Sequence, residues 1–285
     1  MTTQNPNEVL AAWETSSQYW SKYQHMVEIM FAPMSRVLIE EAGIGPGQSV
    51  LDVGGGSGEP SLTIAKTVGE LGSVTYTDPA AGMVKAASAE AGRRGFSNIQ
   101  FQQAGAEQLP FPDDSFDAIV SRLSAMFFGE PLGGLREMLR VAKPDGCVAL
   151  MVWSSSEANP FFRGVSEVLD RFVAPEPEVE DAPTAFRFAA RGKLAKLLEA
   201  AGAHSVTERK FPFSIEAPID IDQFWNLRTE MSDSFRKKLA GLVPDQVAAI
   251  KYAVQKNVAR YFKTGSMNFP GEVLIVTGRK RAVGT

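Results

Sequence analysis

The sequence predicts a doubly wound α/β fold, in which helices cover both faces of a mostly parallel sheet. Short apolar runs alternate with segments of helical spacing through the centre of the chain, and a glycine-rich bend at 54–58 directly follows the first run. The 285 residues, 44% of them hydrophobic, are enough for a sizeable core.

Five apolar runs are the strand candidates of the central region. They are SVLDV (49–53), VTYT (74–77), IQF (99–101), FDAIV (116–120) and CVALMVW (147–153). The stretches between them repeat apolar residues at helical spacing, as Leu62, Ala65 and Val68 do. Strands and helices that alternate in this way are typical of a parallel sheet with crossover helices.

The second half of the chain is less regular. A Pro-rich, acidic segment at 174–183 predicts an exposed loop, and the apolar stripe within 194–201 predicts a helix. Strands are expected near 205–211 and 272–277, with a wholly helical block at 218–263 between them. Because this block lies between two late strands, we interpret it as an inserted cap and not as an independent domain. The N-terminal stretch is also predicted to be helical.

Composition excludes several classes of protein. The chain has 33 acidic and 29 basic residues, and its net charge of -4 argues against a dedicated nucleic-acid binder. A single cysteine, Cys147, excludes an internal disulfide and a zinc site built on several thiolates, and two histidines leave little for a metal centre, so no metal site is predicted. We find no signal-peptide pattern and no apolar run long enough to span a membrane, so a cytoplasmic location is expected.

The glycine-rich segment VLDVGGGSGEP (50–60) is the most informative part of the sequence. Its glycines permit a tight turn and a close approach of a ligand to the backbone. The dinucleotide fingerprint fails, because Glu59 and Ser61 stand where its last glycine would be, and no Lys-Ser/Thr pair completes a P-loop. The carboxylate of Asp52 would repel a pyrophosphate but would attract a ligand with ammonium and sulfonium groups. An ordinary glycine-rich turn is the structural alternative.

A second acidic residue, Asp78, ends the second strand candidate. A carboxylate at this place can accept hydrogen bonds from both hydroxyls of an adenosine ribose. Asp78 could also be only a helix N-cap. The loop, the spacing and the strand order together favour an adenosine ligand.

These motifs resemble those of the class I S-adenosylmethionine-dependent methyltransferases, in the branch with the ubiquinone/menaquinone-biosynthesis enzymes. Asp52 and the glycines match the D-x-G-x-G-x-G motif, and Asp78-Pro79 with Met83 matches the second motif. The runs at 106–122 and 135–153 are also similar. The resemblance implies a seven-stranded Rossmann-like sheet whose last, antiparallel strand is supplied by EVLIVTGRK. It also implies S-adenosyl-L-methionine as cofactor and S-adenosyl-L-homocysteine as product.

The resemblance also implies which residues would hold the cofactor. Asp52 would help to hold its ammonium group, and Asp78 its ribose. The other expected contacts are Gly54, Gly55, Gly56 and Gly58 on the methionine part, Pro79, Met83, Gly105, Ala106 and Glu107 around the adenine, and Ser121, Arg122 and Leu123 beneath the methionine chain. Many relatives carry an acidic residue in place of Gly105. Glu107, a backbone carbonyl or packing alone would therefore have to hold the adenine amino group.

We expect residues 1–285 to form a single methyltransferase domain. Its expected parts are an N-terminal helical lid (1–40), a cofactor-binding core (41–153), a loop or lid (154–190) and the helical cap insertion (214–265).

The expected reaction is a direct displacement on a small methyl acceptor. A general base is needed only if the acceptor must lose a proton; His25 and Tyr19, both in the N-terminal helical region, are the candidates. The segment SRLSAMFF (121–128) lacks the N/D-P-P-Y/F motif of enzymes that methylate planar amines. Aromatic residues beyond the fifth strand form either an apolar acceptor pocket or ordinary cap core. We therefore expect an apolar or aromatic acceptor, such as a quinone, polyketide-like or lipid precursor, with a tRNA or protein substrate as the alternative. No nucleic-acid partner is expected, and the oligomeric state stays open.

Overall fold

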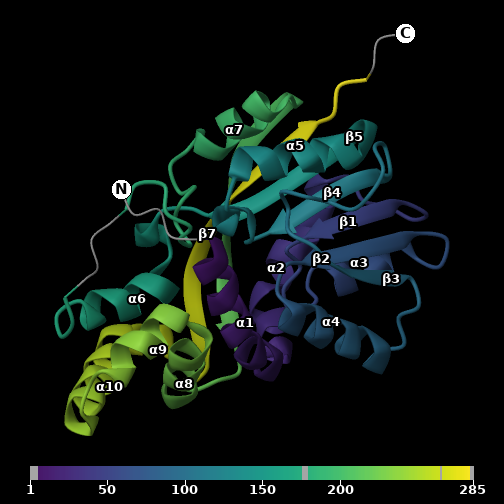
Figure 1. Cartoon of the computed structure of the whole chain (residues 1–285). Coiled ribbons are helices and arrows are strands. Elements are labelled where there is room, and N and C mark those ends of the chain that lie inside the picture. The colour runs from purple at the N-terminus through teal and green to yellow at the C-terminus, as the bar shows by residue number, and fades with distance from the viewer. Residues whose placement is uncertain (1–5, 175–178, 264, 283–285) are drawn as a thin grey trace.

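The computed structural model describes residues 6–174, 179–263 and 265–282. These residues form a seven-stranded sheet with helices on both faces (Figure 1). The strand order is β3-β2-β1-β4-β5-β7-β6, and β7 is antiparallel to both of its neighbours. The strands are β1 (Ser49–Val53), β2 (Ser73–Asp78), β3 (Ile99–Gln103), β4 (Phe116–Arg122), β5 (Ala142–Trp153), β6 (His204–Ala217) and β7 (Met267–Arg279). The predicted sheet with its antiparallel last strand is confirmed.

The parallel strand pairing determines which face of the sheet each connecting helix covers. Because such crossovers are right-handed and the strand order reverses after β3, α3 (Ser61–Val68) and α4 (Ala81–Arg93) cover one face and α5 (Pro131–Val141) covers the other. On the second face, α7 (Lys193–Ala201) packs beside α5. Gly202, at φ 113, ends α7 as a left-handed C-cap.

The long strands β6 and β7 form an antiparallel ribbon that carries the cap helices. Their pairing continues to Ala217 and Met267, where the chain leaves the sheet. The cap consists of α8 (Ile221–Met231), α9 (Asp233–Ala240) and α10 (Pro244–Val258). The block predicted as wholly helical is therefore broken, at Ser232, whose hydroxyl caps α9, and before Pro244, which starts α10.

A helix lies inside the stretch 154–190, which was expected to form a loop or lid. Helix α6 (Pro160–Leu169) starts with a proline in its first turn and buries Phe161, Val165 and Val168. These residues stand at helical spacing.

Two helices precede the sheet. Helix α2 (Gln24–Glu41) buries one face against the sheet, whereas α1 (Pro6–Lys22) packs against both α4 and the cap helix α8 (Figure 1). The predicted N-terminal lid, 1–40, includes residues 1–5, which lie outside the described residues. None of the described helices has both the length and the apolar character that crossing a bilayer requires.

Candidate active site

A pocket of about 870 Å³ opens at the carboxyl ends of the parallel strands. Segments that follow β1, β2, β3 and β4 meet there, because parallel strands end at the same edge of a sheet. The remaining walls come from α1, from Val27 and Phe31 of the second helix, from residues 127–132 and from residues 179–197. The volume lies in the upper range for small-molecule sites.

The glycine loop presents bare backbone to this pocket. The N–H groups of Gly54 and Gly55 donate to the carbonyl of Thr77, which fixes the loop against β2. A Cβ at Gly54 would lie 1.9 Å from the hydroxyl of Ser124, so no side chain fits there. A Cβ at Gly56, where φ is +56°, would meet nothing within 4 Å, because this residue faces open space. The loop is thus a cradle whose open side only a ligand would fill.

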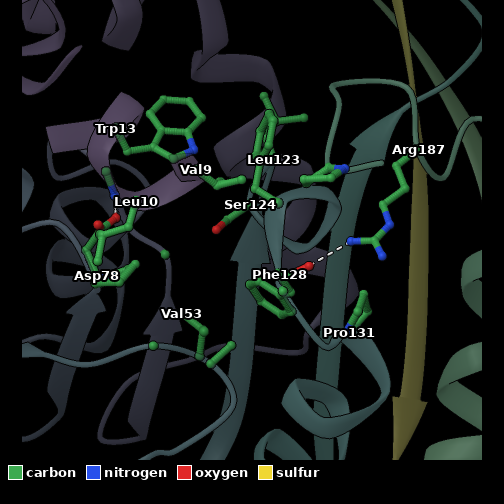
Figure 2. A pocket seen from close by; sticks show the side chains of 18 of the residues that line it. Val9, Leu10, Trp13, Val53, Asp78, Leu123, Ser124, Phe128, Pro131 and Arg187 are labelled. Carbon is green, nitrogen blue, oxygen red and sulfur yellow. Dashed lines mark hydrogen bonds between the residues drawn. The ribbon is translucent and has the colours of Figure 1, made fainter. Parts of the chain in front are cut away.

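Asp78 stands at the wall of the pocket, at the end of β2 (Figure 2). Its carboxylate accepts hydrogen bonds from the N–H of Gly56 at 3.0 Å and from the N–H of Ala80 at 2.9 Å. Burial raises the pKa of Asp78 to about 6, although both hydrogen bonds act to lower it. The group is therefore mostly ionised at neutral pH and keeps lone pairs for a ligand's hydroxyl groups.

Asp52, by contrast, lies beneath the loop and does not line the pocket. One carboxylate oxygen accepts the hydroxyl of Ser61 at 2.6 Å, and the other is buried with no hydrogen-bond partner. Burial raises the pKa of Asp52 to about 7, while Ser61 and the charge of Arg122 act in the opposite direction. The structure therefore does not place Asp52 where it could touch an ammonium group in the pocket.

Arg122 is a buried cation that also lines the pocket. Its guanidinium donates to the carbonyl of Phe31 at 3.3 Å and the hydroxyl of Ser35 at 2.8 Å, both in α2, and to the carbonyl of Glu59 at 2.9 Å. Burial lowers the pKa of Arg122, and the nearby carboxylates of Glu59 and Asp52 oppose that change. Arg122 thus joins α2, β4 and the end of the glycine loop around one charge.

The carboxylate of Glu107 takes the space above Gly105. One of its oxygens accepts the N–H of Glu130 at 3.2 Å, and the other lies 3.2 Å from where a Cβ of Gly105 would stand. Pro79 and Met83 line the same end of the pocket. The carboxylate of Glu107 therefore lies close to the place where a side chain at position 105 would begin.

Aromatic residues of α1 and of the segment after β4 form an apolar wall. Trp13 meets Phe127 edge to face, with ring centroids 5.0 Å apart, and Trp20 packs on Trp13. Figure 2 shows Leu10 and Trp13 on the same side of the pocket as Asp78, with Arg187 on the opposite side.

Most of the aromatic residues expected beyond the fifth strand do not reach the pocket. Among them only Phe188 lines it. Others, such as Phe161 of α6 and Phe224 of the cap helix α8, pack on each other and on Phe269 of β7. Of the two alternatives that the sequence left open, these residues are mainly cap core.

Carboxylates outnumber cations around the pocket. Of its described lining residues, six are acidic and three are basic: Glu59, Asp78, Glu107, Glu130, Glu180 and Asp181, against Arg122, Arg187 and Lys193. Two of the cations are already paired, because Arg187 and Lys193 both bind Asp181 and hold its pKa at about 2. The lining thus favours a ligand with positive charge. No cluster of three potential metal ligands occurs in the part of the chain that the structure describes.

The pocket brings together eleven of the fourteen predicted cofactor residues. They are Gly54, Gly55, Gly56, Asp78, Pro79, Met83, Gly105, Ala106, Glu107, Arg122 and Leu123. Asp52, Gly58 and Ser121 do not line it, and Ser121 is fully buried in β4.

Neither candidate base lies at the pocket. The side chain of His25 is 82% exposed, 3.8 Å from Glu28, because its position in α2 turns it to solvent. The ring of Tyr19 lies under the guanidinium of Arg236, 4.5 Å away, on the cap side of α1. Sequence reasoning missed the wall residues Trp13 and Trp20, although their spacing of seven places them on one helix face.

The comparisons with known proteins agree with this geometry. A family model described as "Methyltransferase domain" matches residues 51–150. An uncharacterized protein of Mycobacterium tuberculosis is 36% identical over 148 residues, which are 52% of this chain and 53% of that protein. The chain therefore spans about half the length of the first curated relatives it matches. A ubiquinone/menaquinone biosynthesis C-methyltransferase UbiE of Pectobacterium carotovorum is 34% identical, over 58% of this chain and 66% of the relative.

A longer alignment is found with the nocamycin O-methyltransferase of Saccharothrix syringae, which is 28% identical over 89% of this chain and 93% of the relative. Among solved structures, the YcgJ protein of Bacillus subtilis superposes with a TM-score of 0.55 at 22% identity, covering 87% of this chain and 98% of that one, and supports the fold. S-adenosylmethionine is the cofactor of this family. By its domain match, its relatives and its fold, the chain belongs to the class I S-adenosylmethionine-dependent methyltransferases of the UbiE-like type.

Proposed function

We propose that this chain transfers the methyl group of S-adenosylmethionine to a small apolar or aromatic molecule. The observation that carries the proposal is the pairing of Asp78 with the open backbone of Gly56 at the edge of an 870 Å³ pocket. A carboxylate held in place by two N–H groups is ready to accept the two hydroxyls of a ribose.

The cofactor would lie along the carboxyl ends of β1, β2 and β3. Its methionine part would pack on the backbone of Gly54–Gly56, and its adenine would lie beside Met83 with its amino group toward Glu107. Because Asp52 does not reach the pocket, its role would be to hold the loop from below through Ser61. The excess of carboxylates favours a ligand that carries both a sulfonium and an ammonium group.

The bound cofactor supplies a methyl group that is already activated. The chain's own residues would align the acceptor with it and exclude water, which is most of what such a displacement requires. The wall formed by Trp13, Trp20 and Phe127 suits a flat apolar acceptor. Since neither His25 nor Tyr19 lines the pocket, we infer that the acceptor does not depend on either residue for loss of a proton.

The names of the relatives support a quinone or a polyketide-like acceptor. The UbiE relative aligns over little more than half of this chain, whereas the nocamycin O-methyltransferase aligns over 89% of it. The acidic lining opposes the alternative of a tRNA substrate, whose phosphates need cations.

Calorimetric titration with S-adenosylhomocysteine tests the proposal. The wild-type chain should bind it, and Asp78→Asn should weaken binding by roughly a hundredfold, since two charge-assisted hydrogen bonds are lost at about 1.5 kcal/mol or more each. Asp117→Asn is the matched control, because Asp117 is also a strand aspartate but bonds Lys143 and the N–H of Ser49 away from the pocket. Absence of binding by the wild type at millimolar ligand would refute the proposal.

Methyl transfer itself needs a second assay. Purified enzyme with radiolabelled S-adenosylmethionine should label hydroquinones or polyketide-like phenols and acids in preference to bulk tRNA. Transfer to tRNA alone would contradict the proposed acceptor class while leaving the cofactor site intact.

A further inference from the structure

The cap insertion lies close to the pocket but does not form any of its walls. No described residue after Leu197 lines the pocket, so α8, α9 and α10 have no direct contact with a ligand there. The cap helices α8 and α9 pack instead against α1. Helix α1 therefore both lines the pocket and contacts the cap helices directly.

Helix α1 carries two different faces. Leu10, Trp13 and Trp20 line the pocket, whereas Ser16 and Tyr19 do not. Ser16 is only 3% exposed although it carries a hydroxyl group. Figure 1 shows α1 between the sheet domain and the cap helices.

Arg236 of α9 joins the second face of α1 to the cap. Its guanidinium donates to the hydroxyl of Ser16 at 2.8 Å and lies 4.5 Å from the ring centroid of Tyr19. It also donates to the carbonyl of Glu230 and pairs with Asp233 at 3.1 Å, so its own position is fixed within the cap. The planar guanidinium suits this place, because it can bond a hydroxyl and stack on a ring together.

A second polar contact joins α1 to the cap, this time to α8. Lys22, at the end of α1, pairs with Glu230 of α8 at 2.5 Å. The side chains of Lys22 and Glu230 are 56% and 31% exposed, whereas that of Arg236 is 18% exposed. An exposed pair of this kind contributes little, so Arg236 is the stronger polar link.

We infer that Arg236 is a positioning residue: it fixes α1 against the cap and thereby holds Trp13 and Trp20 in the wall of the pocket. This inference rests on the proposed function for its effect on ligand binding. It also assigns a role to the cap insertion, which is to support the wall of the pocket from outside.

Three variants test the inference against a matched control. Arg236→Ala removes the guanidinium that contacts Ser16 and Tyr19. Ser16→Ala removes only the hydroxyl that accepts its hydrogen bond on α1. Arg236→Lys keeps the positive charge but not the planar guanidinium. Lys237→Ala is the control, because Lys237 pairs with the same Asp233 at 2.7 Å but is 73% exposed. Alanine is a better helix former than serine, so loosening of α1 in Ser16→Ala could not come from helix propensity.

Two measurements should be made on each full-length variant. The first is the Kd for S-adenosylhomocysteine, which should rise by roughly threefold to thirtyfold in Arg236→Ala, the range for a residue coupled to a site that it does not touch. The second is hydrogen exchange of residues 7–22, which should become faster. Arg236→Lys should show smaller changes than Arg236→Ala in both the Kd and the exchange rate, and Lys237→Ala should change neither quantity. The double variant Ser16→Ala/Arg236→Ala should have the same Kd and exchange rate as Arg236→Ala alone.

An unchanged Kd together with unchanged exchange of α1 in Arg236→Ala overturns the inference, as does exchange that rises equally over the whole chain with no change in Kd. If Arg236→Ala does not fold, Ser16→Ala decides by the same two criteria. If the wild type binds no S-adenosylhomocysteine, the proposed function is wrong, and the exchange of α1 still decides whether Arg236 positions it.

Discussion

Replacing Asp52 by asparagine should stabilise the protein at alkaline pH. One oxygen of Asp52 accepts the hydroxyl of Ser61, and the other is buried without a partner. An asparagine oxygen can keep the bond to Ser61, and the substitution removes a charge that the fold solvates poorly.

The size of the effect follows from the pKa. Asp52 titrates at about 7 in the folded chain against 3.8 ordinarily, a difference of about three pKa units, which corresponds to about 4 kcal/mol. Because the folded pKa is the higher one, the contribution of protonated Asp52 to the free energy of unfolding is fully present below pH 3.8. That contribution is lost as the pH rises through 7. The buried amide N–H₂ of asparagine costs about 1–3 kcal/mol where it finds no acceptor, which leaves a net gain of about 1–3 kcal/mol at pH 8.

Urea unfolding at pH 5, 6, 7 and 8 measures this gain. The free energy of unfolding of Asp52→Asn should exceed that of the wild type at pH 8, and the advantage should shrink toward pH 5. Asp117→Asn should instead be less stable than the wild type by an amount that stays nearly constant from pH 5 to pH 8. Against the effect of burial, Lys143 and the N–H of Ser49 lower the pKa of Asp117 below 3.8, so this group stays ionised over the whole range. A variant less stable than the wild type at pH 8, or an advantage that does not depend on pH, would refute the reasoning.

Three further predictions concern the pocket. Glu107→Ala should weaken S-adenosylhomocysteine binding by roughly ten- to hundredfold in calorimetry. Adding Gly105→Asp should restore most of the affinity, because a side chain at position 105 begins beside the carboxylate of Glu107. Failure of that rescue would show that Glu107 does not hold the adenine. His25→Ala and Tyr19→Phe should leave kcat within about twofold in a methyl-transfer assay, since neither residue lines the pocket, and a loss of a hundredfold or more would restore them as bases. Gly56→Ala should lower the free energy of unfolding by about 1–2 kcal/mol through its positive φ and should also impair binding, because its Cβ would enter the ligand's space; normal affinity would contradict the cradle.

The sheet could be predicted because its strands are nearly continuous apolar runs. Residues 49–53 and 116–120 lie buried on both faces in the centre of the sheet, where local sequence and tertiary environment agree. Helix α6 was not placed from the sequence because it is only ten residues long and begins at a proline, although Phe161 and Val165 carry its helical spacing.

The glycine loop and Asp78 could be placed from the sequence, since their positions follow from strand ends alone. The aromatic wall could not, because it depends on how α1 packs between α4 and the cap. The same reason explains His25, whose outward direction is set by the packing of α2 and not by the residues around it. The burial of Asp52 beneath its loop likewise needed the path of the backbone.

The surplus of acidic groups around the pocket has a consequence for turnover. Donation of the methyl group turns a sulfonium into a neutral thioether, so the spent cofactor has one positive charge fewer than the fresh one. Surroundings rich in carboxylates attract the charged form more strongly. Under the proposed function, the spent cofactor would therefore bind less tightly than the fresh one. Electrostatics would favour its exchange for new cofactor, most strongly at low ionic strength.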